Sequence, residues 1–336
     1  MRNHRQRLAA AACSIAAAVL LAAVPAAGQT QSPTTSARTP WGDPDLQGIW
    51  YFGTVTPMER PEELAGQTVL TEEEAAAFEQ RYATARDRPN PRVGEECPEE
   101  FFACEGSGLA YEWRIWLDLG TTVVSTRRTS LVVDPPDGRI PALTPAGEAR
   151  RQAELAAYAR AAGPEDFLLH DRCVVGYNSG PPITPGPSLN LVQVFQSPGV
   201  VAIRPEIGDA RVIPTDGRPR PAFRQWQGQP RGRWEGDTLV VETRHARVFM
   251  NATHATPWLR LVERFTRTGD DELLYEVRVE DPTNWTRPWA FELPMTSHAG
   301  PLYEYGCHEG NYSMPVMLGG ARRAEREAAA AAAEAR

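Results

Sequence analysis

The stretch that decides the fold is residues 259–281, LRLVERFTRTGDDELLYEVRVED. It contains two runs in which apolar and polar residues alternate, separated by Thr-Gly-Asp-Asp at residues 268–271. Alternation with period two is typical of a strand with one buried face, and a cluster of Gly and Asp between two such runs is typical of a turn. The stretch therefore predicts two neighbouring antiparallel strands, residues 259–267 and 272–281.

Similar short runs occur on both sides of this stretch. The sequence predicts further strands at residues 46–55, 191–196, 200–205, 210–213, 238–243 and 285–293. Many short strands punctuated by turn residues predict a mainly β fold, an antiparallel barrel or sandwich. Two helices are expected at its periphery, at residues 71–86 and 145–162. Thr71 with Glu74 forms a capping box, and Thr144 precedes a proline at the first helical position.

The N-terminus predicts export from the cytoplasm. Three arginines precede an apolar run at residues 8–23, and small residues follow up to Gly28, which is the pattern of a cleaved signal peptide. A membrane anchor is the alternative, but the run is short for a bilayer span. We therefore expect a signal peptide at residues 1–28, a flexible tether at 29–44, a single β-rich domain at 45–320 and a dispensable Ala/Glu-rich helical tail at 321–336. The protein would be periplasmic or secreted.

Four cysteines remain after the expected cleavage, Cys97, Cys104, Cys173 and Cys307. An even number in an exported chain predicts two disulfides, with three possible connectivities. Cys97 and Cys104 are close enough in sequence to close a short ring, which would leave Cys173 to pair with Cys307. A metal site is the alternative, but zinc-type spacing is lacking, so no metal and no cofactor are expected.

Composition excludes several classes of function. The formal net charge of −8 argues against a nucleic-acid partner and against an anionic membrane surface. The chain contains no lysine, which excludes a Schiff-base lysine and a P-loop lysine. No stable membrane insertion is expected.

Two charged residues fall on otherwise apolar strand faces. Glu263 alternates with leucine and phenylalanine, and Arg287 alternates with Trp285, Trp289 and further apolar residues. An unpaired buried charge is costly, so we expect Glu263 and Arg287 to pair with each other or with a ligand. A wet interior, or a register shifted by one residue, is the alternative.

Several segments together resemble an uncharacterised family of secreted bacterial proteins. The segments are WGDPDLQGIW (41–50), RTSLVVDPPDGR (128–139), LTP (143–145), RGRWEGDTLVV (231–241), LVERF (261–265) and YGCHEGNY (305–312). That resemblance implies no particular reaction. A second resemblance, to lipocalin-like barrels, is carried by Gly48-x-Trp50 on the first strand. It implies an arginine late in the barrel, here Arg287, packed on Trp50.

The residues best suited to chemistry are Cys307-His308-Glu309-Gly310-Asn311-Tyr312. His308 is a candidate general acid or base, and Glu309 could orient it. Asn311 and Tyr312 are candidate ligand-binding residues. An ordinary disulfide-anchored loop is the alternative.

A second candidate is Asp209 with Arg211. Two residues apart on a strand, they would face the same side and could bind an anionic or hydroxyl-rich ligand. A surface ion pair of little energetic value is the alternative.

Two functional hypotheses follow. The first is a binding protein for a small or oligomeric ligand in an aromatic-lined cavity, with candidate aromatic residues Trp50, Trp226, Trp234, Trp285 and Trp289. The second is an exported hydrolase, lyase or isomerase that uses His308 and acidic partners.

Overall fold

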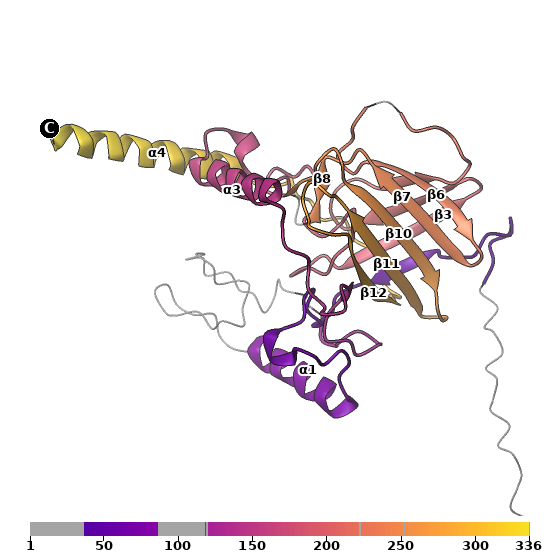
Figure 1. The fold of residues 1–336 in the computed structure, drawn as a ribbon. Coiled ribbons are helices and arrows are strands. Elements are labelled where there is room, and N and C mark those ends of the chain that lie inside the picture. The colour runs from indigo at the N-terminus through magenta and orange to yellow at the C-terminus, as the bar shows by residue number, and fades with distance from the viewer. Residues whose placement is uncertain (1–36, 87–117, 119, 222, 251–252, 336) are drawn as a thin grey trace, which may run out of the picture. The chain divides into compact units, whose positions relative to one another are not determined.

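The alternating segments form one strongly curved antiparallel sheet (Figure 1). The computed structural model describes residues 37–86, 118, 120–221, 223–250 and 253–335. The predicted signal peptide, residues 29–36 of the tether, Cys97 and Cys104 lie outside the described residues. The strands of the main sheet are β1 (Gly48–Tyr51), β2 (Val132–Asp134), β3 (Leu191–Ser197), β4 (Val200–Pro205), β5 (Arg211–Pro214), β6 (Gln229–Glu235), β7 (Thr238–Arg244), β10 (Arg260–Arg267), β11 (Glu272–Glu280) and β12 (Trp289–Ser297).

Strand β1 joins the two halves of the sheet, because it pairs with β3 on one side and with β12 on the other. Nine of its ten strands follow the order β5-β4-β3-β1-β12-β11-β10-β7-β6. The tenth strand, β2, pairs with β12 off this path. Trp50 in β1 lies opposite Val192 on one side and Ser297 on the other. A separate pair, β8 (Val248–Phe249) and β9 (Thr253–His254), interrupts the connection between β7 and β10. The predicted antiparallel barrel is confirmed, and it is nearly closed.

The remaining gap lies between β5 and β6, and we call it the seam. Every neighbouring pair along the nine-strand path is antiparallel. An odd number of alternating strands leaves the two end strands running in the same direction. Parallel neighbours need a crossover connection, and residues 215–228 run back from the end of β5 to the start of β6. The starts of both strands, Arg211 and Gln229, are therefore at the same end of the barrel.

The interior of the barrel is packed with large side chains. Trp50, Tyr275, Phe265, Trp289 and Phe291 are each at most 2% exposed. Burial of a large apolar side chain contributes roughly 1.5–3 kcal/mol, so this cluster supplies much of the stability. Because aromatic rings occupy the interior, a ligand site has to be sought at the seam or at the ends of the barrel.

Among the described residues, three helices lie outside the sheet, with two short 3-10 turns (Glu62–Leu64 and Pro164–Asp166). The predicted helix α1 (Glu72–Arg86) has its capping box: the Thr71 amide donates to Glu74 Oε2 at 2.8 Å, and the Glu74 amide donates to Thr71 Oγ1 at 3.1 Å. Helix α3 (Pro145–Arg160) is capped by Thr144, as predicted. Helix α4 (Ser313–Glu334) begins before the predicted residue 321 and runs through two glycines.

The last strand differs from the prediction. Residues 285–293 were expected to be extended, but β12 begins at Trp289. The amides of Asn284 and Trp285 both donate to the Asp281 carbonyl at 3.0 Å, which forms a turn after β11. Pro288 cannot donate to a ladder, so pairing starts only after it. Arg287 therefore lies in a connection, exposed to solvent.

An arginine packs on Trp50, as the lipocalin-like resemblance implies, but it is Arg267 and not Arg287. Trp50 Nε1 donates to the Leu46 carbonyl at 3.0 Å. The guanidinium of Arg267, at the end of β10, lies 5.5 Å from the Trp50 ring centroid. The expectation that Arg287 packs on Trp50 was wrong, because Arg287 precedes its strand and turns outward.

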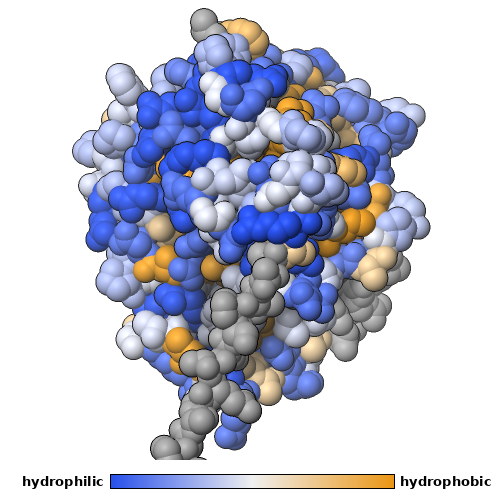
Figure 2. Space-filling view, turned by 90° about the vertical axis from the view of Figure 1, so that its right-hand side faces the viewer, coloured by the Kyte–Doolittle hydropathy of each residue, from blue (hydrophilic) through white to orange (hydrophobic). Residues whose placement is uncertain are grey.

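No helix among the described residues is long and apolar enough to cross a membrane. The face of the molecule in Figure 2 is mostly hydrophilic, and its hydrophobic residues lie in small separate groups.

Candidate functional site

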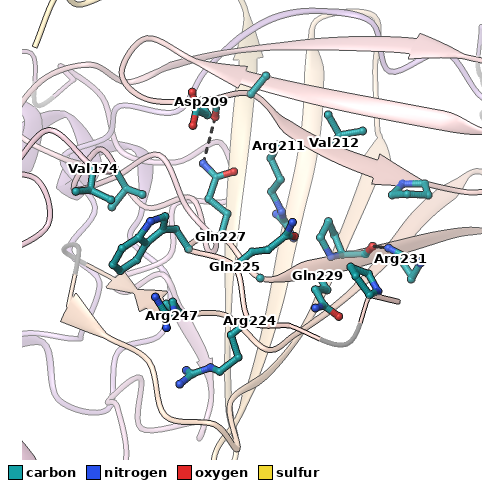
Figure 3. Close-up of a pocket in the computed structure, with 17 residues that line it drawn as sticks. Val174, Asp209, Arg211, Val212, Arg224, Gln225, Gln227, Gln229, Arg231 and Arg247 are labelled. Carbon is teal, nitrogen blue, oxygen red and sulfur yellow. Dashed lines mark hydrogen bonds between the residues drawn. The ribbon is translucent and has the colours of Figure 1, made fainter. Parts of the chain in front are cut away.

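A cavity with a volume of about 660 Å³ lies at the seam. We call it the seam pocket (Figure 3). It is lined by the start of β5, the start of β6, the crossover before β6 and the segment around Val174. Gly232 of β6 approaches β5 so closely that a Cβ there would lie 3.0 Å from Ile213 Cγ2. The seam is therefore tight at Gly232, and the pocket lies at the other end, where both strands begin.

A buried ion pair connects this pocket to the core. Arg211 Nη1 donates to Glu263 Oε1 at 2.7 Å, and Arg211 Nη2 donates to Glu263 Oε2 and to Thr243 Oγ1. Tyr275 Oη donates to Glu263 Oε1 at 2.8 Å and accepts from the Ile183 amide at 3.1 Å. The carboxylate is completely buried, and these donors compensate its lost hydration.

The expectation that Glu263 and Arg287 pair with each other was wrong: Glu263 pairs with Arg211, and Arg287 pairs with Asp134. Arg287 Nη2 donates to Asp134 Oδ1 at 2.7 Å, and both side chains are largely exposed. The two predicted partners lie on opposite sides of the barrel wall, since Glu263 points inward. The guanidinium that reaches Glu263 comes from Arg211, at the seam.

The surroundings keep the Arg211 guanidinium charged and the Tyr275 hydroxyl protonated. Burial lowers the pKa of the Arg211 guanidinium, but the charge and hydrogen bonds of Glu263 more than offset it, so the net pKa is raised. Burial raises the pKa of Tyr275 well above its ordinary value, and the Glu263 charge adds to this. Tyr275 therefore remains a hydrogen-bond donor throughout the neutral range.

Three further arginines surround the pocket, and we call Arg224, Arg231 and Arg247 the rim arginines. Within the described part of the chain, none of them forms an ion pair with a carboxylate. Arg224 donates to the carbonyls of Ala246 and Ala255, and Arg231 donates to three backbone carbonyls. The guanidinium groups of Arg224 and Arg231 are therefore hydrogen-bonded to carbonyl groups but not paired with a carboxylate.

The rim arginines also affect one another. Burial lowers the pKa of Arg224, and the nearby charge of Arg247 lowers it further. Burial likewise lowers the pKa of Arg231, together with the charges of two neighbouring arginines. Both groups remain protonated at neutral pH, so Arg224 stays beside the positive charge of Arg247, and Arg231 beside those of Arg220 and Arg218.

One wall of the pocket is apolar. Val174, Val175, three prolines and Trp226 line it. Trp226 is 37% exposed, and the Arg247 guanidinium lies 5.3 Å from its ring centroid. This cation–π contact holds a charged group beside an accessible indole surface.

The structure brings the predicted pair Asp209 and Arg211 into this one pocket. Asp209 precedes β5 and is exposed, and its carbonyl accepts from Gln227 Nε2 at 3.1 Å (Figure 3). Arg211, the first residue of β5, points into the barrel. Among the described residues that line the pocket, Asp209 is the one acidic residue, against four arginines.

Sequence reasoning did not identify the rim arginines or Gln229. A signal was present, because residues 218–233 read RPRPAFRQWQGQPRGR, where arginine is frequent and prolines prevent regular pairing. The strand β6 within this segment was also missed, since its Pro-Arg-Gly-Arg pattern does not alternate in hydrophobicity.

The predicted cluster around His308 lies elsewhere. Cys173 and Cys307 form the expected disulfide, with their Cα atoms 5.8 Å apart. His308 and Glu309 are exposed, and neither lines the seam pocket. Asn311 Nδ2 donates to Cys173 Sγ at 3.1 Å, and Tyr312 is 73% exposed. Roles for these residues in catalysis or binding stay predictions.

A smaller cavity of about 280 Å³ lies beside α3, and Trp285 and Trp289 contribute to its lining. Its buried carboxylate, Asp281, already accepts from Thr256 Oγ1 and from the amide and hydroxyl of Thr283. The cavity therefore has fewer uncommitted charges than the seam pocket. Trp50 lines neither cavity, and its role in binding stays a prediction.

No family model, curated protein or solved structure shows significant similarity to this chain. Function is therefore argued from the geometry of the pocket.

Proposed function

We propose that this protein binds a small organic anion in the seam pocket. The observation that carries the proposal is the set of rim arginines, Arg224, Arg231 and Arg247, none of which has a carboxylate partner within the described residues, around a cavity of about 660 Å³. This volume lies within the range of about 300–1,000 Å³ that is usual for small-molecule sites.

The pocket is lined mainly by positive charges, although the chain as a whole is acidic. The protein carries a formal net charge of −8, yet arginine outnumbers acidic residues at the pocket. Glu263 neutralises Arg211, which leaves three rim charges against Asp209 alone. A local positive site on an acidic protein attracts small anions selectively and repels large polyanions through the surrounding field.

The apolar wall favours an organic anion over an inorganic one. Trp226 and two valines offer surface that a phosphate or chloride ion cannot use. An aromatic or branched carboxylate could place its apolar part against Trp226 and its charge between the rim arginines. Guanidinium groups bind carboxylates well because two parallel N–H donors match two oxygens.

Isothermal titration of the full chain with cinnamate tests this proposal. Arg247→Ala should weaken binding about tenfold, since a hydrogen bond to a charged group contributes roughly 1.5–3 kcal/mol. Arg233→Ala is the matched control, because Arg233 lies on β6 but pairs with Glu235 outside the pocket. Affinity should also fall as salt rises. Absence of any binding, or equal affinity in Arg247→Ala and the wild type, would refute the proposal.

We also propose that the protein works outside the cytoplasm. The signal-like pattern of residues 1–28 and the Cys173–Cys307 disulfide support this location. N-terminal sequencing of protein recovered from the periplasm or the medium tests it. A chain that starts at Met1 and stays in the cytoplasm would contradict it.

A further inference from the structure

Three buried polar atoms of residues that line the seam pocket lack partners within the described residues: Arg224 Nε on the half-buried rim, and one atom on each of the deeply buried residues Gln229 and Arg211. Gln229 is 1% exposed, and its Nε2 donates to the Phe223 carbonyl, which identifies the other amide atom as the oxygen. Within the described residues, neither Gln229 Oε1 nor Arg211 Nε has a hydrogen-bond partner. Arg211 is 5% exposed, and its other two nitrogens are occupied by Glu263 and Thr243.

These two residues form the floor of the pocket, and the rim arginines lie around them. Figure 3 shows Arg211 and Gln229 between Arg231 on one side and Arg224 with Arg247 on the other. Buried polar groups in folded proteins almost always have partners, so each exception calls for an explanation. Because both residues line the pocket, a ligand that enters it is a possible source of the missing partners.

The floor offers one acceptor, Gln229 Oε1, and one N–H donor, Arg211 Nε. A hydroxyl group is the smallest neutral group that can both donate and accept. A second carboxylate would fit poorly, since the Arg211 charge is already neutralised by Glu263 and the amide oxygen would repel it. An ammonium group would fit poorly as well, because it has no lone pair with which to accept a hydrogen bond from Arg211 Nε.

We propose that the ligand of the seam pocket is a hydroxylated aromatic carboxylate, with its carboxylate at the rim arginines and its hydroxyl at Gln229 and Arg211. This inference rests on the proposed anion binding and adds the chemical class of the ligand. The aromatic ring lies against Trp226, and small rotations of the Gln229 side chain bring its oxygen to the hydroxyl.

The test compares three probes by isothermal titration of the full chain: 4-hydroxycinnamate, cinnamate and 4-methoxycinnamate. The hydroxyl compound should bind about five- to tenfold more tightly than cinnamate, the effect of one or two added hydrogen bonds. The methoxy compound can accept but cannot donate to Gln229, so it should bind no better than cinnamate. In Gln229→Leu the ratio of the affinities for 4-hydroxycinnamate and cinnamate should fall to about one.

Arg247→Ala separates the inference from the proposed function. It should weaken cinnamate and 4-hydroxycinnamate by the same factor and leave their ratio unchanged. Equal affinities for these two probes in the wild type would overturn the inference and leave anion binding intact. Failure of all three probes to bind would overturn both. If Gln229→Leu does not fold, the methoxy probe decides: methoxy binding as tight as hydroxyl binding would overturn the inference.

Discussion

The buried ion pair yields the sharpest prediction, for Arg211→Met. Glu263 is completely buried and accepts hydrogen bonds from Arg211, Tyr275 and Thr243. The substitution keeps an apolar side chain of similar length but leaves the carboxylate with two hydroxyl donors and no positive charge. Removing one partner of a buried pair typically costs about 3–5 kcal/mol. Total stabilities are about 5–15 kcal/mol, so the variant should lose a large fraction of its stability.

Urea denaturation, followed by circular dichroism, measures this loss. With a slope of about 3 kcal/mol per molar urea, the midpoint should fall by roughly 1–2 M. The matched control is the double variant Arg211→Met/Glu263→Leu, which replaces both charges by apolar groups. It should recover most of the lost stability, because no buried charge is left unpaired and apolar side chains fill the space of the original pair. A single variant within about 1 kcal/mol of the wild type, or a double variant no more stable than the single one, would refute the reasoning.

Three further predictions concern other parts of the molecule. Replacing Cys173 and Cys307 together by Ser should lower the unfolding free energy by about 5 kcal/mol, because the bridge spans 134 residues; unchanged urea midpoints would contradict this. Burial raises the pKa of Glu206, whose Oε2 accepts from the Leu191 amide, so its ionisation destabilises the fold as pH rises above its unfolded pKa. Glu206→Gln should therefore be more stable than wild type at pH 7, and thermal melts should show this advantage shrinking towards pH 4; an advantage that grows on acidification would show the opposite sign. The free energy of unfolding of His308→Ala should lie within about 0.5 kcal/mol of that of the wild type, and the variant should bind cinnamate equally well, since His308 is exposed and lies outside the seam pocket. A loss of binding would show that the His308 cluster takes part in the site.

The sequence alone determined features that depend on neighbouring residues. Period-two alternation located β4 at residues 200–205 and placed Glu263 on an inward face. The Thr71–Glu74 capping box located the start of α1, because the atoms that form it are three residues apart. The need for a partner at Glu263 followed from the cost of a buried charge.

Only the tertiary structure decided which residue meets that need and where a ligand can bind. Arg211 and Glu263 are 52 residues apart, and they meet because β5 ends the sheet at the seam. Arg287 alternates with apolar residues in the sequence, but Pro288 delays the start of its strand, so Arg287 lies in an exposed connection. The seam pocket lies between β5 and β6, the two ends of the nine-strand path, which are not hydrogen-bonded to each other as neighbours in the described sheet. Such closure depends on the register of the whole barrel, and no local stretch of sequence encodes it.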